Sequence, residues 1–208
     1  MPELLGEERA LLSERAVPRR RLQFQLGRAA AHEALQGAGH PACPIGRGVR
    51  GEPLWPDNIV GAITHTDDVA IAAVAPRSYS AGIGIDLEAI AHLSKSIDHL
   101  VYTSDEQAWI AAADGEAQAR CRRAQLFSAK EAIFKAVYPA SGQWLDYLDA
   151  SLRWCSIRQV FSAAIPNWHG PALEIGCQTL GPYVFTATWL PATLHEPATK
   201  RRPLELSL

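Results

Sequence analysis

The sequence predicts a mixed α/β fold, of the α+β type, that is built from two parts. Two long segments carry apolar residues at helical spacing, and short runs of alternating or β-branched apolar residues between and after them are typical of strands. The length of 208 residues fits one large domain or two small ones. Hydrophobic residues form 48% of the chain and charged residues 20%, which excludes a disordered or fibrous protein.

The first helix is expected over residues 20–36. Its apolar side chains repeat at helical spacing: Phe24, Ala31 and Leu35. Arg28 falls on the same face, and Gly37 is a typical end for a helix. The following loop, residues 40–56, is rich in glycine and proline. It also carries two arginines, Arg47 and Arg50.

Strands are expected next in three runs: residues 59–64, 69–75 and 82–88. The first two are joined by a polar turn that contains His65. Residues 76–81 form a short polar connection, which we interpret as the boundary between the two parts of the chain. The expected organisation is therefore an N-terminal part over residues 1–80 and a C-terminal part over residues 81–208.

The C-terminal part is expected to continue with helices and to end with strands. Thr103 and Glu106 have the spacing of a capping box, so a helix should start there. A longer helix over residues 116–138 is expected to stop at Pro139. Three further strands are expected: residues 151–157, 172–176 and 184–190. The proline-containing tail, residues 191–208, is expected to be loose.

The charge and the cysteines disfavour several classes of protein. The formal net charge of −2 and the pI of about 6.4 give no overall footprint for nucleic acid. No run approaches the ~20 apolar residues that cross a bilayer, and the acidic start of the chain does not resemble a secretory signal. The four cysteines form no CxxC pair: Cys43, Cys121, Cys155 and Cys177. We therefore expect a cytoplasmic protein with reduced thiols.

Two acidic residues share one face of the strand expected over residues 82–88. Side chains alternate along a strand, so Asp86 and Glu88 lie on the same side as Gly84, about 7 Å apart at about 3.3 Å per residue. We expect Gly84 to leave open space beside them. Two like charges this close are unfavourable without a cation. The alternative is a strand that ends at solvent with both carboxylates hydrated.

The helix over residues 116–138 places two charged residues on faces that should be buried. Glu131 lies in an aromatic stripe, and Lys130 lies beside a second apolar stripe. Charged residues at buried positions are rarely left unpaired. Lys135 follows Glu131 by four residues, which is the spacing of a helical ion pair. The alternative reading is therefore a Glu131–Lys135 pair at a solvated rim.

The three carboxylates Asp86, Glu88 and Glu131 have the chemistry of a magnesium site. Neither histidine nor cysteine accompanies them, and Mg²⁺ prefers a few carboxylates together with water and substrate phosphates. This donor set points to phosphoryl chemistry.

Two groups of residues offer contacts to an anion. His65 stands between Thr64 and Thr66, so three donors follow one another, unless the histidine only bonds the local backbone. Arginines near the first helix suit phosphate binding, although any one of them is more often a solvated residue: Arg19, Arg20, Arg21, Arg28, Arg47 and Arg50. A separate basic cluster either docks an acidic partner or forms a solvated helix face: Arg120, Arg122 and Arg123.

Two segments in this order resemble the signature of the 4′-phosphopantetheinyl transferases. They are GIDLE at residues 84–88 and FSAKEAIFK at residues 127–135, and the 45 residues from Asp86 to Glu131 fit the spacing of that signature. Three more motifs resemble the enterobactin-synthetase type of this superfamily: FQLGR at residues 24–28, PLWP at 53–56 and THT at 64–66. The resemblance covers roughly residues 19–138.

The resemblance implies a fold and an activity. Larger members of the family are monomers made of two similar α/β halves related by pseudo-twofold symmetry, with the active site between the halves. The family transfers the 4′-phosphopantetheine arm of coenzyme A to a serine of an apo acyl or peptidyl carrier protein and releases 3′,5′-ADP. The carrier supplies the nucleophile, so no catalytic serine or cysteine is expected here. Residues 59–76 and 172–191, each read as strand, turn and strand, agree weakly with two alike halves.

The resemblance also implies roles for individual residues. Three carboxylates would hold Mg²⁺ against the coenzyme A pyrophosphate: Asp86, Glu88 and Glu131. Glu131 would also be the general base for the carrier serine. Lys135, and with it Lys130, would steady the phosphates, and His65 would contact one of them. Three arginines would reach the nucleotide and its 3′-phosphate: Arg28, Arg47 and Arg50.

One departure from the family pattern is Glu52, where some relatives have a lysine immediately before the proline of the loop motif. Either Arg47 or Arg50 replaces that cation, or the contact with the 3′-phosphate differs.

Two other functions stay open at this stage. The first is a Mg²⁺-dependent phosphohydrolase or nuclease that uses the same three acids, although the net charge of −2 disfavours a nuclease. The second is a non-catalytic module that binds coenzyme A or a carrier, which the intact acidic set disfavours. The carrier served is equally open: siderophore, non-ribosomal peptide, polyketide and fatty-acid pathways all fit, and the enterobactin-like motifs favour secondary metabolism by analogy.

Overall fold

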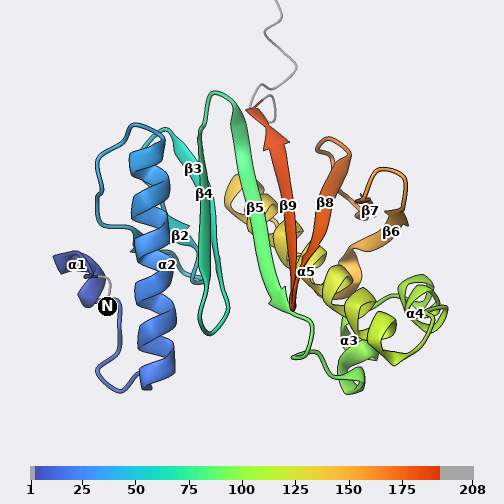
Figure 1. Ribbon diagram of the computed structural model, residues 1–208. Coiled ribbons are helices and arrows are strands. Elements are labelled where there is room, and N and C mark those ends of the chain that lie inside the picture. Colours follow the sequence, from blue (N-terminus) through green and yellow to red (C-terminus); the bar gives the residue numbers. More distant parts are fainter. Residues whose placement is uncertain (1–2, 193–208) are drawn as a thin grey trace, which may run out of the picture.

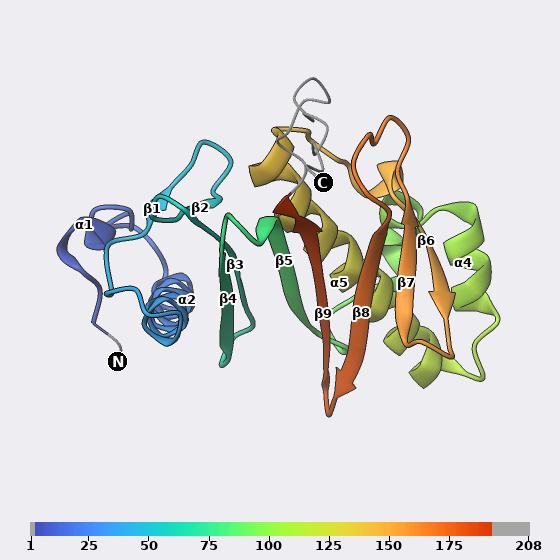
Figure 2. The same ribbon diagram turned by 90° about the horizontal axis from the view of Figure 1, so that it is seen from above.

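The computed structural model describes residues 3–192, in which a short β1-β2 pair accompanies two larger groups of antiparallel strands, each covered by one long helix (Figure 1). The mixed α/β class expected from the sequence is confirmed. Seen from above, the two groups stand side by side (Figure 2). We call them the N-terminal part and the C-terminal part, and their division at residue 80 stays a prediction.

The N-terminal part is a long helix packed on a two-stranded hairpin. Its elements are α1 (Gly6–Arg9), α2 (Pro18–Gly37), β1 (Gly46–Arg47), β2 (Pro53–Leu54), β3 (Ile59–His65) and β4 (Ala70–Pro76). Pro18 opens α2 at a position where its missing N–H costs no helical hydrogen bond. The hairpin pairs Ile59 with Pro76 at one end and His65 with Ala70 at the other. A small core joins helix, loop and strand: Ala31, Leu35, Ile45 and Ile59.

The C-terminal part is a five-stranded antiparallel sheet with α5 across one face. Its elements are β5 (Ser80–Ala89), the 3₁₀-helix η1 (Lys95–Ile97), α3 (Asp98–Val101), α4 (Ser104–Ala111), α5 (Glu116–Ser141), the 3₁₀-helix η2 (Tyr147–Asp149), β6 (Ser151–Cys155), β7 (Val160–Ala164), β8 (Leu173–Leu180) and β9 (Tyr183–Pro191). The strand order is β5-β9-β8-β7-β6. The larger hydrophobic core lies here, between α5 and the sheet.

Several short elements were not expected, and two differences concern the C-terminal part. The long helix does not stop at Pro139 but continues to Ser141, where Gly142 ends it with a left-handed φ of 70°. A proline so close to the helix end removes only one hydrogen bond, whereas the left-handed turn suits glycine. Strand β7 was not expected at all, because it is short and mostly small residues. It is fixed by its neighbours, with Phe161 opposite Trp154 on β6 and Ile175 on β8.

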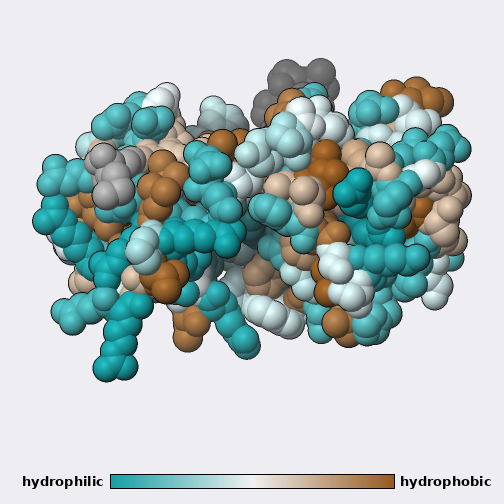
Figure 3. All heavy atoms as spheres, turned by 60° about the horizontal axis from the view of Figure 1, so that its bottom comes forward, coloured by the Kyte–Doolittle hydropathy of each residue, from teal (hydrophilic) through white to brown (hydrophobic). Residues whose placement is uncertain are grey.

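The surface of the molecule shows few features that bear on the fold. Within residues 3–192 no helix is long and apolar enough to cross a membrane. On the face seen in Figure 3 the surface is hollowed between the two parts, and hydrophilic side chains gather on the N-terminal part. Most of the tail that was expected to be loose, residues 193–208, lies outside the described residues.

Candidate active site

Helix α5 lies unusually close to strand β5, and two glycines permit this approach. A Cβ atom at Gly84 would lie 1.7 Å from the backbone oxygen of Ala132, and one at Gly82 would lie 2.3 Å from that of Ala136. The expected open space beside Gly84 is therefore wrong, because the helix backbone fills it. Side chains alternate along β5, so Asp86 on the same face comes next to the helix.

Asp86 is buried and is held by residues from both parts of the molecule. The Nζ atom of Lys135 lies 2.7 Å from its Oδ1 atom, and the hydroxyl of Thr64 donates to the same oxygen at 3.1 Å. Within the described residues the buried Oδ2 atom has no hydrogen-bond partner. The alternative of a Glu131–Lys135 pair at a solvated rim is wrong, because the close approach of β5 offers Lys135 a buried carboxylate instead.

The pKa of Glu88 depends on the burial and the charges around the face of β5 that carries Asp86. Burial, and next the charge of Asp86, raise its pKa to about 7, and the charge of Glu131 contributes in the same direction. The three carboxylates therefore repel one another, although they lie on two different elements. The raised pKa of Glu88 therefore reflects its burial first and the negative charges of its neighbours second.

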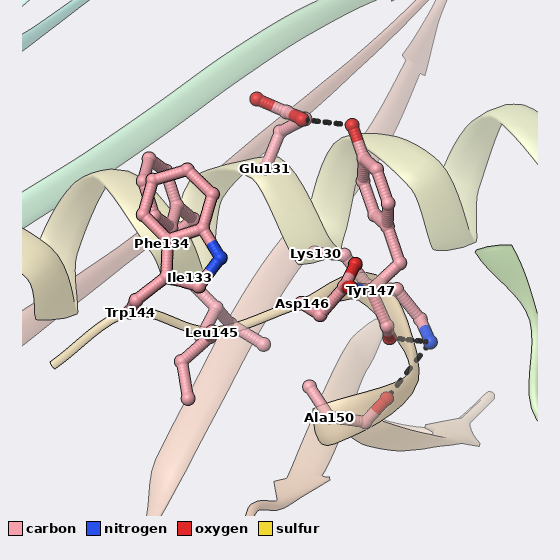
Figure 4. Close-up of a pocket in the computed structure, with 9 residues that line it drawn as sticks. All are labelled: Lys130, Glu131, Ile133, Phe134, Trp144, Leu145, Asp146, Tyr147 and Ala150. Atoms are coloured by element: carbon pink, nitrogen blue, oxygen red, sulfur yellow. Dashed lines mark hydrogen bonds between the residues drawn. The ribbon is translucent and has the colours of Figure 1, made fainter. Parts of the chain in front are cut away.

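Glu131 is held by a residue that the sequence reasoning missed. The hydroxyl of Tyr147, in η2, donates to Oε1 of Glu131 at 2.6 Å (Figure 4). Burial, and then the charge of Glu131, raise the pKa of Tyr147, so its phenol stays protonated. Nothing in the sequence pattern marks Tyr147, since it stands in a short irregular segment 16 residues after its partner.

These carboxylates fit a hard cation by chemistry and only in part by geometry. Their oxygens are the donors that Mg²⁺ prefers, and Asp86 offers an unpartnered buried oxygen. However, no group of three histidine, cysteine, aspartate or glutamate side chains in residues 3–192 is arranged to hold one metal ion. Lys135 and Tyr147 hold two of the three carboxylates on separate partners. A shared ion would require at least one side chain to turn.

The three successive donors around His65 do not act together. Thr64 is buried, and its hydroxyl donates to Asp86 and accepts from the backbone N–H of Leu87 at 3.0 Å. Thr66 accepts from the backbone N–H of Val69 within the turn. His65 alone keeps a buried ring nitrogen, Nδ1, with no partner among the described residues. Burial, followed by the charges of Arg20 and Lys135, lowers the pKa of His65, so its ring is neutral near two cations.

The three arginines expected at the nucleotide lie in different environments. Arg28 is buried, donates to the backbone oxygen of Gly46 at 3.1 Å and lies over the ring of Phe24. Its guanidinium therefore faces protein groups and holds β1 at Gly46, and a nucleotide contact by Arg28 stays a prediction. Arg47 and Arg50 are exposed on that loop. Arg50 crosses to the C-terminal part, where it lies 4.6 Å over the ring of Trp144.

Glu52, the loop residue that departs from the family pattern, directs its side chain back to the backbone of its own loop. Glu52 Oε2 accepts from the backbone N–H of Arg50 at 2.9 Å. The carboxylate thus closes the turn that presents Arg50.

Lys130 is not placed as expected. Its Nζ atom lies 2.8 Å from Oε2 of Glu106, and both side chains are almost fully buried. It also donates to the backbone oxygens of Tyr147 and Ala150 at 2.7 and 2.8 Å (Figure 4). All three ammonium donors are therefore used inside the protein, which leaves none for a phosphate. The expectation was wrong because Glu106, assigned only to a capping box, is also the partner of this lysine.

Two pockets meet at Glu131. The first lies between α5 and the segment that follows it, and its walls are mainly apolar and aromatic: Ile133, Phe134, Trp144, Leu145 and Tyr147 (Figure 4). The second lies between the N-terminal loop, β3 and α5, and it includes Arg50, Lys135 and Tyr138. Glu131 and Phe134 line both, so the carboxylate stands where the two parts of the molecule face each other.

The basic cluster on α5 is not a docking patch. Arg123 is buried and pairs with Asp98 and Glu116. Arg122 lies over the ring of Trp109 and donates to its backbone oxygen. Only Arg120 of the three is exposed. The expectation of an exposed basic cluster was wrong because the second and third arginines are consecutive on the helix face that packs against α3 and α4.

Two family models match the chain. Residues 7–75 match the 4′-phosphopantetheinyl transferase N-terminal domain, and residues 82–187 match the 4′-phosphopantetheinyl transferase superfamily. Together they cover nearly all of the described residues.

Two of the curated relatives described next are named 4′-phosphopantetheinyl transferases, and a third is an enterobactin synthase component. The chain is 39% identical over 149 residues to the 4′-phosphopantetheinyl transferase Svp of Streptomyces mobaraensis, which covers 72% of this chain and 61% of that protein. It is 37% identical over 141 residues to the 4′-phosphopantetheinyl transferase Npt of Nocardia iowensis, covering 68% and 62%. It is 32% identical over 120 residues to the enterobactin synthase component D of Salmonella typhi, covering 57% and 48%. The matches thus span about three-fifths of the length of the first two relatives.

Solved structures match about half of the chain. The holo-[acyl-carrier-protein] synthase of Thermotoga maritima aligns with a TM-score of 0.46 at 15% identity, over 54% of this chain and 64% of that one. The holo-(acyl-carrier-protein) synthase of Bacillus anthracis, in complex with CoA (3′,5′-ADP), aligns with a TM-score of 0.45 at 21% identity, over 54% and 97%.

Proposed function

The chain belongs to the 4′-phosphopantetheinyl transferase superfamily, and from this premise we propose that it transfers the 4′-phosphopantetheine arm of coenzyme A to a serine of an apo acyl or peptidyl carrier protein. The observation that carries the proposal is the packing of α5 on two strand glycines, because it brings Lys135 against Asp86 and Glu131 within the field of Glu88. Phosphoryl transfer mainly needs such positioning and charge neutralisation.

In the proposed reaction the serine oxygen attacks the phosphorus atom that carries the pantetheine arm. A P–O bond forms to the serine, and the bond from that phosphorus to the bridging oxygen of the pyrophosphate breaks. The electron pair of that bond leaves with 3′,5′-ADP. The serine proton goes to Glu131, directly or through water. Lys135 supplies a positive charge close to the reacting phosphates.

We propose that Asp86, Glu88 and Glu131 hold Mg²⁺. When bound, the ion would neutralise charge on the pyrophosphate. The unpartnered buried oxygen of Asp86 supports this, and so do the charges of Asp86 and Glu131, which add to burial in raising the pKa of Glu88. For the ion to bind, the protein would have to release at least one of these carboxylates from its present partner.

Coenzyme A would lie across the two pockets that meet at Glu131. The apolar pocket beside Phe134 and Tyr147 suits the methyl and methylene groups of the pantetheine arm. Lys135 lines the second pocket and its charge acts on His65, so we place the pyrophosphate beside these two residues. The exposed guanidinium groups of Arg47 and Arg50 would contact the nucleotide.

The test is a mass measurement on a panel of apo carriers drawn from siderophore, non-ribosomal peptide, polyketide and fatty-acid pathways. Incubation with coenzyme A and Mg²⁺ should add the mass of one 4′-phosphopantetheine group to at least one carrier and release 3′,5′-ADP. An unmodified carrier with coenzyme A split would indicate a phosphohydrolase. Unmodified carrier and intact coenzyme A across the panel would indicate a non-catalytic binding module.

Two further expectations belong to this proposal. We propose a cytoplasmic protein, and the four free cysteines agree with a reducing compartment. We also propose that it acts as a monomer, which light scattering of the purified protein would check.

A further inference from the structure

We propose that Tyr147 is a positioning residue that fixes Glu131 for the transfer reaction. This inference rests on the proposed function and adds to it a residue that lies outside the matching motifs. Tyr147 stands in η2, where its ring lines the pocket proposed for the pantetheine arm and its hydroxyl donates the 2.6 Å hydrogen bond to Oε1 of Glu131. The inference concerns the hydroxyl alone.

The hydrogen bond restrains a side chain that would otherwise turn freely. Glu131 is half-buried at the junction of two pockets, and within the described residues its carboxylate has no other hydrogen bond. A hydrogen bond to a charged group is stronger than a neutral one. The phenol takes one oxygen of the carboxylate and leaves the second for a proton or a ligand (Figure 4).

Tyr147 is itself held by two contacts with α5. Its ring is stacked on Phe127, with centroids 5.4 Å apart. Its backbone oxygen accepts from the buried ammonium of Lys130 at 2.7 Å. Lys130 pairs with Glu106, which is fully buried and accepts from the backbone N–H of Leu152 at 2.7 Å. Through Lys130 and Glu106, the backbone of Tyr147 is therefore connected to α4, α5 and β6.

This chain of contacts gives the buried Lys130–Glu106 pair a function beyond stability. Lys130 and Glu131 are neighbours in the sequence but point to different sides of α5. The lysine fixes the backbone of Tyr147, and the hydroxyl of Tyr147 fixes the glutamate. Residues that orient a reacting group in this way typically contribute about 10- to 100-fold to metal affinity or activity.

The kinetic test is Tyr147→Phe, which keeps the stacked ring and removes the hydroxyl. We expect kcat to fall about tenfold or more with little change in the KM for coenzyme A, and the apparent Mg²⁺ requirement to rise. The matched control is Tyr79→Phe, an exposed tyrosine in the turn before β5, which should leave both constants unchanged. A Tyr147→Phe enzyme with wild-type kcat and Mg²⁺ dependence would overturn the inference.

The structural test does not depend on activity. Crystal structures of the wild-type protein and of Tyr147→Phe should show Glu131 in one conformer in the first and in a different or divided conformer in the second. An unchanged Glu131 in Tyr147→Phe overturns the inference even if kcat falls. If the wild-type protein transfers nothing to any carrier, the proposed function fails, while these two structures still decide whether Tyr147 positions Glu131.

Discussion

At the scale of single residues, two lysines five positions apart on α5 have different surroundings and therefore different uses. Lys130 is enclosed: its side chain is 2% exposed, and every donor is used by Glu106 and two backbone oxygens. Lys135 is 25% exposed and borders the second pocket while it pairs with Asp86. Only the second lysine can contact a ligand without dismantling the protein interior.

Replacing Lys130 should therefore destabilise the fold. Lys130→Met leaves Glu106 buried without its partner, and we expect a loss of about 3–5 kcal/mol in the free energy of unfolding. Urea denaturation measures this, and Lys95→Met, at an exposed lysine in η1, is the control. Equal unfolding midpoints for the two variants would show that the buried pair contributes little.

Glu88 should make stability depend on pH in the absence of metal. Its pKa is raised from 4.5 in the unfolded chain to about 7 in the folded protein, so the folded state holds the proton longer. Stability from this group is full below about pH 4.5 and is lost as the pH rises to about 7, because the folded state then binds more protons than the unfolded state.

The variant Glu88→Gln removes this dependence. With EDTA present, it should gain stability relative to wild type at pH 8 but not at pH 4.5, as measured by urea denaturation at both values. Glu14→Gln, at an exposed glutamate, serves as the control. If Mg²⁺ binds as proposed, it should raise the Tm of the wild type at pH 8 more than that of Glu88→Gln. A pH-independent difference between the two proteins would contradict the assignment of the raised pKa.

At the scale of elements, the contact between α5 and β5 determines the site. Gly82 and Gly84 lack the side chains that would keep the helix at its usual distance, and the nearest atoms to their missing Cβ positions are backbone oxygens of the helix. Backbone cannot move aside as a flexible side chain can. The same contact brings Lys135 within 2.7 Å of Asp86.

Gly84→Ala should separate these elements. A Cβ there would lie 1.7 Å from the oxygen of Ala132, so we expect a loss of about 1–3 kcal/mol or more in stability. Transfer activity should fall further, because the helix carries Glu131 and Lys135. The control is Gly176→Ala on β8, in the same sheet, where the nearest contact would be an ordinary 3.8 Å. Similar behaviour of the two variants would rule out close approach as the reason for Gly84.

At the scale of the whole molecule, the two parts are joined through buried polar contacts as well as apolar packing. Thr64, on β3 of the N-terminal part, donates to Asp86 and accepts from the N–H of Leu87, both on β5 of the C-terminal part. One hydroxyl thus aligns the two parts and restrains a carboxylate of the site. Arg50, over the ring of Trp144, spans the same division nearer the surface.

Thr64→Val should weaken this junction at almost constant volume. The N–H of Leu87 and one oxygen of Asp86 lose their partner, and we expect a cost of about 1–3 kcal/mol in the free energy of unfolding. Thr64→Ser keeps the hydroxyl and should restore most of that stability. Urea denaturation of the three proteins decides this, and a serine variant as unstable as the valine variant would show that the hydroxyl is not what holds the parts together.

Local sequence patterns determined most of the secondary structure and the side on which key residues lie. Helical periodicity and strand alternation are properties of a few neighbouring residues, so they predicted the long helices, the β3–β4 hairpin, the shared face of Asp86 and Glu88, and the burial of Lys130. Strand β7 was not predicted from the sequence, because its position is determined by the strands that pair with it and not by its own short run of residues.

The tertiary structure alone decided which charged groups meet. Lys135 pairs with Asp86 and not with Glu131, Lys130 with Glu106 and not with a phosphate, and Glu131 with Tyr147. These partners come from different elements, and their distances depend on how closely α5 settles on the glycines of β5. The sequence predicts which charged groups will be buried and will therefore need a partner. The packing of distant elements determines which partner each of these groups contacts.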